Sequence, residues 1–494
     1  MHSIQGRKGW FYGDFHRKGS VPKKHIYWIF AILCISVCSA WCADPYIGTL
    51  RHIIRLVHRH AVSTASEREY FNSAVDGLLA SIDENSSFIP PVIYEELNEE
   101  FHQESGTVGI LFWFDEAEKQ YRVGCTFPNS SAREAGIESN DVILSIDGEC
   151  LDTERAQRIL TKLRSPAGTE VKLTFFRPST QKQETRMLVS RKLPVRSVTG
   201  FARRPDSTWV YRLPAFPQSE TGEGTAGETV LSAPLYVKLE TFGEQTAGEM
   251  RKLLTHGMQT DACGLVLDLR GNSGGLLETA LEICGMFVPN GGIMVQIVGK
   301  EAQTPTSISS KTDPIWTRPV AVLIDHRTAS SAEILAVCLQ DWGRKGPLKA
   351  VCIGTRTYGK GTIQNIFDLG PIPDDRGLEK ETDWRTVWKR IHEEPRRGGL
   401  RISSEMYLSP DGHMIHRFPD SQKEDEWGVR PNDGWECRIT ESPEYQREPD
   451  RFEKKWKTHK IQRVAGALPE AEWGEIYVLD PPLKRTLDFF RTEK

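Results

Sequence analysis

The sequence has no excess of positive charge and no series of long apolar segments. Its 63 Lys and Arg residues face 67 Asp and Glu residues over 494 positions, for a formal net charge of −4, so no overall basic field favours nucleic acid. A mean hydropathy of −0.43 excludes a membrane protein with many spans. With 38% hydrophobic and 26% charged residues, the chain has a globular composition and room for two or three domains.

Patterns for disulfide frameworks, metal sites and nucleotide binding are also missing. None of the ten cysteines forms a C-x-x-C pair, and most lie in apolar runs, which favours buried free thiols. No group of histidine, cysteine and carboxylate residues has the spacing of metal ligands. The glycine-rich turn R-G-N-S-G-G lacks the G-K-[ST] ending of a phosphate loop. We therefore expect no metal and no organic cofactor.

One segment near the amino terminus is typical of export. Lysine and arginine residues precede an uncharged apolar run at 26–43, as in a secretory signal or an uncleaved signal anchor. A helix over this run would be about 27 Å long, just enough to cross a bilayer. Either outcome places the rest of the chain outside the cytoplasm in the cell envelope, secreted or anchored to the membrane. The sequence leaves cleavage undecided.

Two strand patterns flank a serine turn and a helix pattern in the stretch 319–364. The first strand, 319–324, leads into T-A-S-S-A, and a helix with one apolar face begins at about Ser331. A serine between a strand and a helix is exposed beside the unpaired first amides of that helix, which suits a nucleophile with an oxyanion hole. The second strand, 350–354, leads to Y-G-K-G, whose glycines leave the Lys360 amine projecting towards whatever faces it.

Each piece of this stretch also has a purely structural interpretation. Ser330 and Glu333 form S-x-x-E, the pattern of a helix capping box, and Lys360 alone fits a solvated loop. No histidine and aspartate flank the serine as a Ser-His-Asp triad would, and nothing places the nearby His326 as a base. The pieces become informative together, because strand, serine turn, helix, strand and G-K-G follow in one order, with Gln364 four residues after the lysine.

Together, the segments T-A-S-S-A-E-I, C-L-Q-D and T-Y-G-K-G-T-I-Q resemble the catalytic core of the carboxy-terminal processing peptidases, or tail-specific proteases. The resemblance implies Ser330 as nucleophile, Lys360 as general base and Gln364 as the supporting amide. Ser331 competes as nucleophile only if the alignment shifts by one residue. This sequence departs from the family pattern at Ala332, where a serine is usual, and in a longer loop after the helix.

The turn R-G-N-S-G-G follows a buried strand pattern at 264–269 and resembles a second motif of the same family. The resemblance implies that the amide of Gly274 or Gly275 is one oxyanion donor and that the amide of Ser331 is the other. Strand and helix patterns alternate around both turns, which predicts a layered α/β architecture. The predicted fold class is thus a multidomain α/β (α+β) protein, with a core that the resemblance makes crotonase/ClpP-like.

A compact unit at 96–191 resembles a PDZ domain in the circularly permuted order of these proteases. Its motifs are G-T-V-G-I-L-F and A-G-I-E-S-N-D-V-I-L-S-I-D-G. In a PDZ fold a peptide adds to the sheet as a strand, and backbone amides of a glycine-containing loop hold its terminal carboxylate. The matching residues here are Val108, Gly109, Ile110 and Leu111. The implied partners are proteins or peptides with a free carboxy terminus.

Changes in composition and pattern divide the chain into several parts. The predicted parts are a basic flank with a signal peptide or anchor (1–43), an N-terminal helical segment (44–95), the PDZ-like domain (96–191), a linker with an insertion (192–234), the serine protease core (235–435, with an insertion at 371–397) and a charged C-terminal tail (436–494).

We expect a serine endopeptidase that cleaves proteins near the carboxy terminus with a Ser-Lys dyad. An exposed lysine has a pKa near 10.4, so burial must lower the pKa of Lys360 by about three units for it to act as a base at neutral pH. Two alternatives stay open. One is a catalytically silent PDZ-type scaffold of the same fold, against which the intact Ser330, Lys360 and Gln364 weigh. The other is a crotonase-like protein that binds acyl groups or another apolar ligand, which leaves the PDZ-like unit unexplained.

Overall fold

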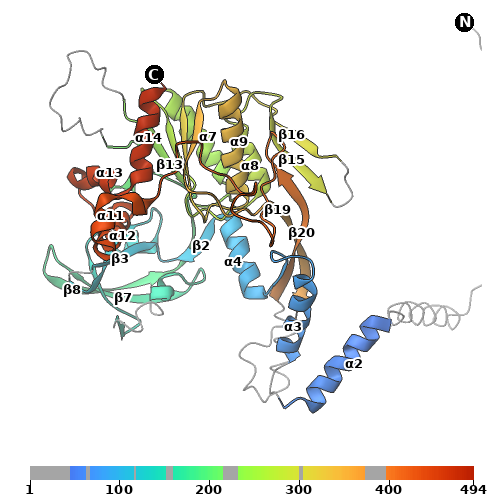
Figure 1. Cartoon of the computed structure of the whole chain (residues 1–494). Helices are drawn as coiled ribbons and strands as arrows, with labels where there is room; N and C mark the ends of the chain where they lie inside the picture. Colours follow the sequence, from blue (N-terminus) through green and yellow to red (C-terminus); the bar gives the residue numbers. More distant parts are fainter. Residues whose placement is uncertain are drawn as a thin grey trace, which may run out of the picture. The chain divides into compact units, whose positions relative to one another are not determined.

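The computed structural model describes residues 45–62, 67–115, 118–151, 160–214, 232–299, 304–372 and 396–493 (Figure 1). Contacts divide the chain into two units, 1–78 and 79–494. The apolar run at 26–43 lies outside the described residues, as does most of the insertion predicted at 371–397. Within the described ranges, no helix has both the length and the apolar character needed to cross a bilayer.

The first unit is helical where the sequence shows helical spacing of apolar residues. It contains α2 (Pro45–His60) and most of α3 (Glu67–Ala80). The apolar side chains of α2 recur every three or four residues, and Ile47, Leu50 and Ile53 are exposed.

The predicted PDZ-like domain is an antiparallel sheet with the strand order β3-β4-β5-β7-β8 and a short β6 beside β5. The strands are β3 (Ile110–Asp115), β4 (Gln120–Thr126), β5 (Val142–Ile146), β6 (Glu149–Cys150), β7 (Glu170–Arg177) and β8 (Lys182–Val189). Val123, Leu173 and Phe175 lie in its closed apolar core. Among the described strands, β3 pairs with β4 alone, so the other edge of β3 has no strand partner there.

The predicted protease core is built on a five-stranded sheet with the order β10-β13-β14-β17-β18. Its strands are β10 (Val198–Thr199), β13 (Leu235–Leu239), β14 (Leu265–Asp268), β17 (Val320–Ile324) and β18 (Ala350–Gly354). The last four run parallel, and β10 is antiparallel to β13. Most of their residues are buried and apolar, as expected for a parallel sheet covered on both faces.

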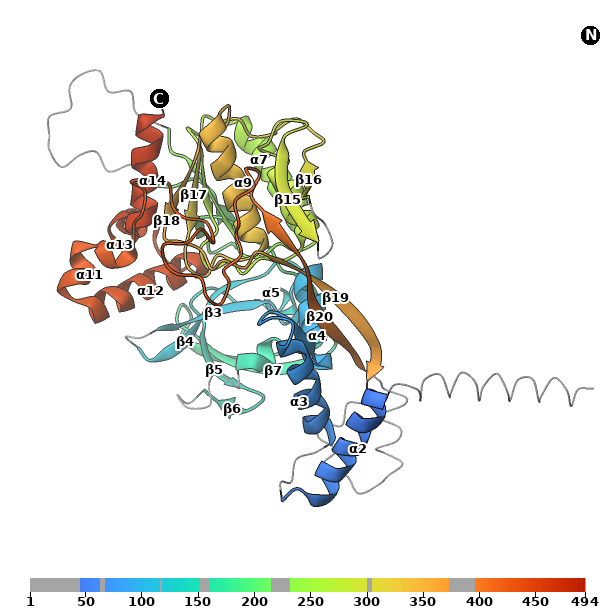
Figure 2. The ribbon, with the colours of Figure 1, turned by 45° about the vertical axis from the view of Figure 1, so that its right-hand side comes forward.

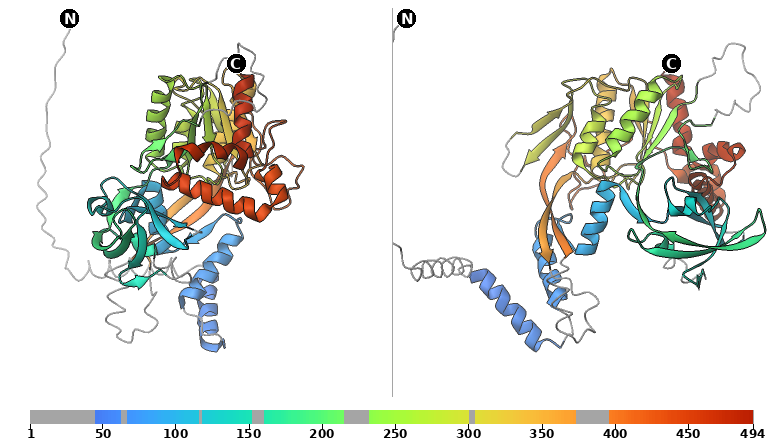
Figure 3. Two further views of the ribbon diagram at one scale, coloured as in Figure 1. Left: turned by 90° about the vertical axis from the view of Figure 1, so that its left-hand side faces the viewer. Right: turned by 180° about the vertical axis from the view of Figure 1, so that it is seen from behind.

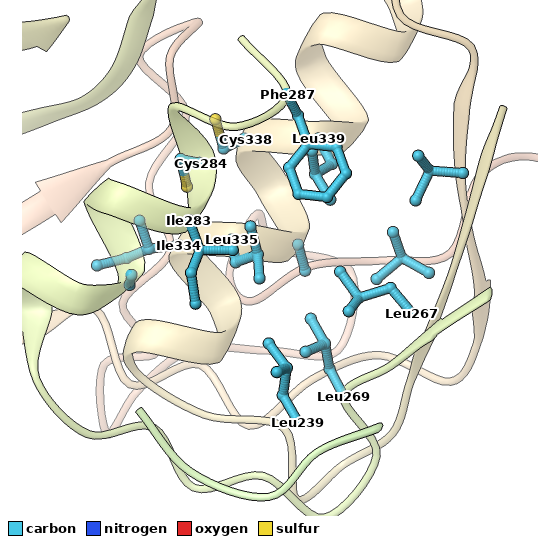
Figure 4. Packing of buried hydrophobic residues seen from close by; sticks show 14 of the residues in the cluster. Leu239, Leu267, Leu269, Ile283, Cys284, Phe287, Ile334, Leu335, Cys338 and Leu339 are labelled. Carbon is cyan, nitrogen blue, oxygen red and sulfur yellow. The ribbon is translucent and has the colours of Figure 1, made fainter. Parts of the chain in front are cut away.

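Three helices cover one face of this sheet. They are α7 (Thr246–Met258), α8 (Leu277–Cys284) and α9 (Ser331–Lys345). Leu335 and Leu339 of α9 belong to one buried apolar cluster with Leu267 and Leu269 of the sheet region, and Ile283 of α8 completes the contact (Figure 4). This packing fixes the start of α9, and therefore the serine turn, at the carboxyl ends of the strands.

The other face is covered by the region that the sequence predicted as a charged, partly helical tail. It forms α11 (Pro443–Arg447), α12 (Pro449–Ala465), α13 (Ile476–Leu479) and α14 (Pro481–Thr492). Leu483, Leu487 and Phe490 of α14 belong to a buried cluster with Val266 and Leu323 of the sheet. In Figure 2, α14 and α9 lie on opposite sides of β17 and β18. The helices are therefore a third layer of the core rather than an appended tail.

Helix α12 also contacts the PDZ-like sheet, at strands β3 and β4. Figure 3 shows this helix (orange-red) next to that domain (teal). The contact is close at Gly124, because a Cβ atom placed there would lie 2.5 Å from the Cβ atom of Ala465. The absence of a side chain at this position lets the helix approach the sheet.

A second sheet of the core carries two segments of the site. Its strands are β1 (Ser87–Ile89), β15 (Ile293–Gly299), β16 (Thr306–Ser309), β19 (Thr362–Ile372) and β20 (Arg396–Leu408). Strand β20 pairs antiparallel with β1, β15 and β19. Because β19 starts two residues after Lys360, the turn that carries Lys360 is attached directly to this sheet.

Candidate active site

Ser330 lies between β17 and α9 in a backbone conformation that non-glycine residues rarely adopt, with φ +55° and ψ −123°. Such a conformation persists only where the surroundings fix it. Here the amide of Ala329 donates to the carbonyl of Asn272 at 2.9 Å, and the amide of Ser330 donates to Glu333 Oε2 at 2.9 Å. Ser330 itself is only half-buried, so part of the residue remains accessible.

Ser331 is in a different position, although it is the next residue. Its side chain is buried, with 2% exposed, and its hydroxyl donates to the carbonyl of Gly275 at 2.9 Å. The structure thus presents Ser330 and not Ser331 as the accessible serine of this turn.

The glycine turn and the serine turn, which the sequence places far apart, meet in the structure. A Cβ atom placed on Gly274 would lie 2.8 Å from Ser330 Cβ and 3.1 Å from the Ser331 amide nitrogen. Of the two predicted glycine donors, Gly274 is already engaged, because its amide donates to Asn272 Oδ1 at 2.8 Å. The amides of Gly275 and Ser331 have no acceptor among the described residues, so these two are free to bind an oxyanion.

Arg270 of the same glycine motif stabilises the turn through two ion pairs. Its guanidinium is 2.7 Å from Asp268 Oδ2 and 2.7 Å from Asp480 Oδ1. Burial acts to raise the pKa of Asp268, but the charges of Arg270 and Lys238 outweigh this and hold that pKa well below its usual range. Because Asp480 is the N-cap residue of α14, the ion pairs also attach the C-terminal layer to the turn.

Lys360 and Gln364 form the hydrogen bond that the family resemblance implies. Lys360 Nζ donates to Gln364 Oε1 at 2.7 Å, and Gln364 Nε2 donates to the carbonyl of Asn85 at 2.6 Å. A carbonyl can only accept, so Asn85 settles which end of the amide faces the lysine. Asn85 itself lies in a turn held by Asp83, whose Oδ1 accepts from the amides of Asn85 at 2.8 Å and Ser86 at 2.6 Å.

The surroundings of Lys360 lower its pKa, the direction that a general base requires. Burial is the main cause and the positive charge of Arg401 adds to it, while the carboxylates of Glu333 and Asp83 act in the opposite direction. A cavity of about 340 Å³ reaches the lysine; it is lined by Glu84, Asn85, Tyr358, Gly359, Lys360, Arg417, Phe418 and Pro419.

Two residues of the site were not predicted. Glu333 was interpreted as a possible capping residue, yet its buried carboxylate also accepts from the amides of Gly359 and Lys360 at 2.7 and 2.8 Å. Burial raises its pKa to about 7, and its hydrogen bonds act against that rise. The one sequence signal is a carboxylate inside an otherwise apolar helix pattern. Tyr407 of β20 contacts both Ser330 and Lys360, and no local pattern marks it.

In the predicted carboxylate-binding loop, the amides of Val108 and Gly109 are already engaged in the fold, whereas Ile110 and Leu111 begin strand β3. Val108 and Ile110 point into the apolar core of the domain, and Gly109 has φ +82° with no room for a side chain, since a Cβ atom would lie 2.2 Å from Ser130 Cβ. The amides of Val108 and Gly109 already donate, to Leu163 O and Thr107 Oγ1, each at 3.0 Å.

Strand β3 continues from this loop with Ile110 and Leu111. Their position at the start of the free edge makes their backbone the remaining candidate contact for a peptide terminus.

Comparisons with known proteins agree with this geometry. The model of peptidase family S41 matches residues 234–421, and a PDZ domain model matches residues 127–177. The chain is 29% identical over 352 residues to a carboxyl-terminal-processing protease of Synechocystis sp., covering 71% of this chain and 70% of that protein. It is 30% identical over 314 residues to a protease of the same description from Picosynechococcus sp., covering 63% and 67%.

A carboxy-terminal-processing protease of Bartonella bacilliformis is 26% identical over 368 residues, with 74% of this chain and 71% of that protein covered. The predicted family, fold class and enzyme class are confirmed, and neither the silent scaffold nor the crotonase-like ligand carrier is favoured. The chain belongs to the carboxyl-terminal processing peptidases of family S41, and it is a serine-type peptidase with a PDZ domain.

Proposed function

We propose that this peptidase uses Ser330 as nucleophile and Lys360 as general base, and that it cuts protein substrates near a free carboxy terminus. The observation that carries the dyad is the convergence of the serine and lysine turns on one carboxylate, with Glu333 Oε2 2.9 Å from the Ser330 amide nitrogen and 2.8 Å from that of Lys360. Free amides of Gly275 and Ser331 lie beside the serine.

Each step of the reaction has a group to perform it. Neutral Lys360 takes the proton of the Ser330 hydroxyl while Oγ bonds to the scissile carbonyl carbon, and the amides of Gly275 and Ser331 bind the resulting oxyanion. When the C–N bond breaks, the Lys360 ammonium returns the proton to the leaving amine, and an ester to Ser330 remains. Lys360 then deprotonates a water that attacks this ester. As the C–O bond to Ser330 breaks, the Lys360 ammonium gives that proton to the serine oxygen, which releases the second product and restores the hydroxyl.

Recognition of a carboxy terminus is supported by the PDZ domain. The free edge of β3 accepts a peptide as an additional strand, and Ile110 and Leu111 lie at the end where the terminal carboxylate of that peptide would bind. The basic flank and apolar run before residue 44 support export from the cytoplasm, so we expect extracytoplasmic substrates. Whether the enzyme remains attached to the membrane depends on cleavage of that run.

The test is cleavage of an unfolded reporter that ends in an apolar tail, with a free carboxylate or an amidated end. Ser330→Ala and Lys360→Ala should each abolish cleavage, whereas Lys311→Ala, at an exposed lysine outside the site, should retain it. The amidated reporter should be cut more slowly if PDZ capture of the carboxylate delivers substrates. Cleavage that survives in folded Ser330→Ala would refute the assignment of the nucleophile, and equal rates on both reporters would refute the recognition mode.

A further inference from the structure

The nucleophile and the base share two hydrogen-bonding partners, one for their amides and one for their carbonyls. Glu333 Oε2 accepts from the amides of Ser330 and Lys360 at 2.9 and 2.8 Å. The Tyr407 hydroxyl lies 3.1 Å from the carbonyl oxygen of Ser330 and 2.6 Å from that of Lys360. We propose that Glu333 and Tyr407 are positioning residues that set the separation and orientation of the Ser-Lys dyad, an inference that rests on the roles proposed above for Ser330 and Lys360.

A hydrogen-bonding partner that Ser330 and Lys360 share limits the distance between their backbones, whereas separate partners would not. Two amides bound to one oxygen atom cannot be farther apart than the two hydrogen bonds together allow, and the same holds for two carbonyls around one hydroxyl. The backbones of Ser330 and Lys360 are thus restrained at both their N–H and their C=O groups. The restraint matters because proton transfer requires the lysine nitrogen within hydrogen-bonding reach of the serine hydroxyl.

A carboxylate is required at position 333 because four donors converge on it. The second oxygen, Oε1, accepts from the Thr357 hydroxyl at 2.5 Å and from the Gly359 amide at 2.7 Å, so the whole turn before the lysine wraps around the Glu333 side chain. A glutamine offers a single acceptor oxygen and would present its NH2 group to two of these donors. Since Glu333 is 0% exposed, water cannot replace the lost acceptor.

Position 407 requires a hydroxyl because two carbonyl oxygens, which can only accept hydrogen bonds, face it in a buried site. Tyr407 is 1% exposed, and its hydroxyl can share its single hydrogen between the Lys360 carbonyl at 2.6 Å and the Ser330 carbonyl at 3.1 Å. Its own amide donates to the carbonyl of Gly361 at 3.0 Å, which aligns β20 with the residue after the base. A phenylalanine would keep the ring packed and remove only the bridge between the two carbonyls.

The test compares Tyr407→Phe with Tyr477→Phe in the full chain. Tyr477 is a matched control because it is also buried, with 3% exposed, and its hydroxyl donates to the carbonyl of Pro214 at 2.8 Å, on the other face of the core sheet. The readouts are kcat and KM on the reporter, and the rate at which a small fluorophosphonate modifies Ser330, which needs no PDZ binding. Circular dichroism and thermal unfolding check that each variant is folded.

We expect Tyr407→Phe to lower kcat and the rate of serine modification together, by roughly 10- to 100-fold, with KM changed less than about twofold. Tyr477→Phe should leave both rates as in the wild type. Unchanged rates in folded Tyr407→Phe, or an equal loss in Tyr477→Phe, would overturn the positioning role. If Ser330→Ala remains active, the dyad itself is wrong; if Ser330→Ala is inactive while Tyr407→Phe is fully active, only the positioning inference fails.

A double variant tests whether both residues act on the same separation. Glu333→Gln should lower kcat with KM little changed, and Tyr407→Phe combined with Glu333→Gln should cost less than the product of the two single effects, because the second change acts on a dyad that is already displaced. Independent, multiplicative losses would show that the two residues do not share one function.

Discussion

The close approach of Gly274 to Ser330, the proposed nucleophile, gives a prediction for which Gly271 serves as the control. Gly274 and Gly271 lie in one turn and both have positive φ, +109° and +74°, so alanine is strained at either position, by about 1–2 kcal/mol. The added methyl groups meet different surroundings. At Gly274 the methyl would lie 2.8 Å from Ser330 Cβ and 3.0 Å from the carbonyl oxygen of Ala329, whereas at Gly271 the nearest atom is Arg327 Nη2 at 3.7 Å.

Stability and activity should therefore separate in these two variants. Both alanines should lower the thermal midpoint, and Gly274→Ala should lower it further because the contact with Ser330 is closer than packed atoms tolerate. Only Gly274→Ala should displace the serine or the neighbouring Ser331 amide. We expect its kcat to fall roughly 10²- to 10³-fold, equivalent to about 3–4 kcal/mol of transition-state stabilisation.

The assay is reporter cleavage under saturating substrate, together with thermal unfolding of each variant. Gly271→Ala should retain most of the wild-type kcat at temperatures where it is folded. Equal activities in the two variants, or a loss in Gly274→Ala that disappears when both are compared at the same distance below their midpoints, would refute the reasoning.

Three further predictions follow from the electrostatics and the packing. The rise of kcat/KM with pH should have its midpoint below the ordinary lysine pKa of 10.5, because burial and Arg401 lower the pKa of Lys360, and Arg401→Gln should move this midpoint upward; a pH–rate profile that does not move would contradict the assignment of the base. The pKa of Glu333 is raised in the folded chain from 4.5 to about 7, so its contribution to stability is complete below about pH 4.5 and is lost as the pH rises through 7. This loss amounts to about 3 kcal/mol. The thermal midpoint of the wild type should therefore fall between about pH 4.5 and 7 relative to that of Glu333→Gln, and midpoints that change in parallel with pH would refute the raised pKa. Leu487→Ala should cost about 2–5 kcal/mol because the side chain is buried in the C-terminal layer, and a change below 1 kcal/mol in denaturant unfolding would show that this layer is not part of the core.

The turns of the site were predictable from the sequence because their chemistry is local. A small-residue turn between a strand and a helix, and a lysine between two glycines, each appear within a few consecutive residues. Burial of Ser331 and the engagement of the Gly274 amide were not predictable, because both depend on how two distant turns meet. The sequence left the choice between these residues open, and in the structure the contacts between the turns bury Ser331 and engage the Gly274 amide.

The residues that contact Ser330, Lys360 and Gln364 from distant parts of the chain were not predictable, for a related reason. Tyr407 and Asn85 reach the site from other strands or turns, and the Gln364–Asn85 hydrogen bond joins residues 279 positions apart. The packing of the C-terminal helices against the sheet was also not predicted, for a different reason. Leu483, Leu487 and Phe490 have the spacing of one helix face, but the many charged residues around them favoured an exposed tail. A parallel sheet needs helices on both of its faces, and this requirement was not applied to the region.

The antiparallel pairing of β1 with β20 joins two parts of the core that are far apart in the sequence. Ser87 lies opposite Arg401, and the hydrogen bond between Ser403 and Ser86 spans 317 positions. Contacts of such high sequence separation form late, because closing a long loop costs entropy before any contact repays it. Strand β20, which carries Tyr407 and pairs with the strand that follows Lys360, therefore completes the site region only when the chain has folded through residue 408.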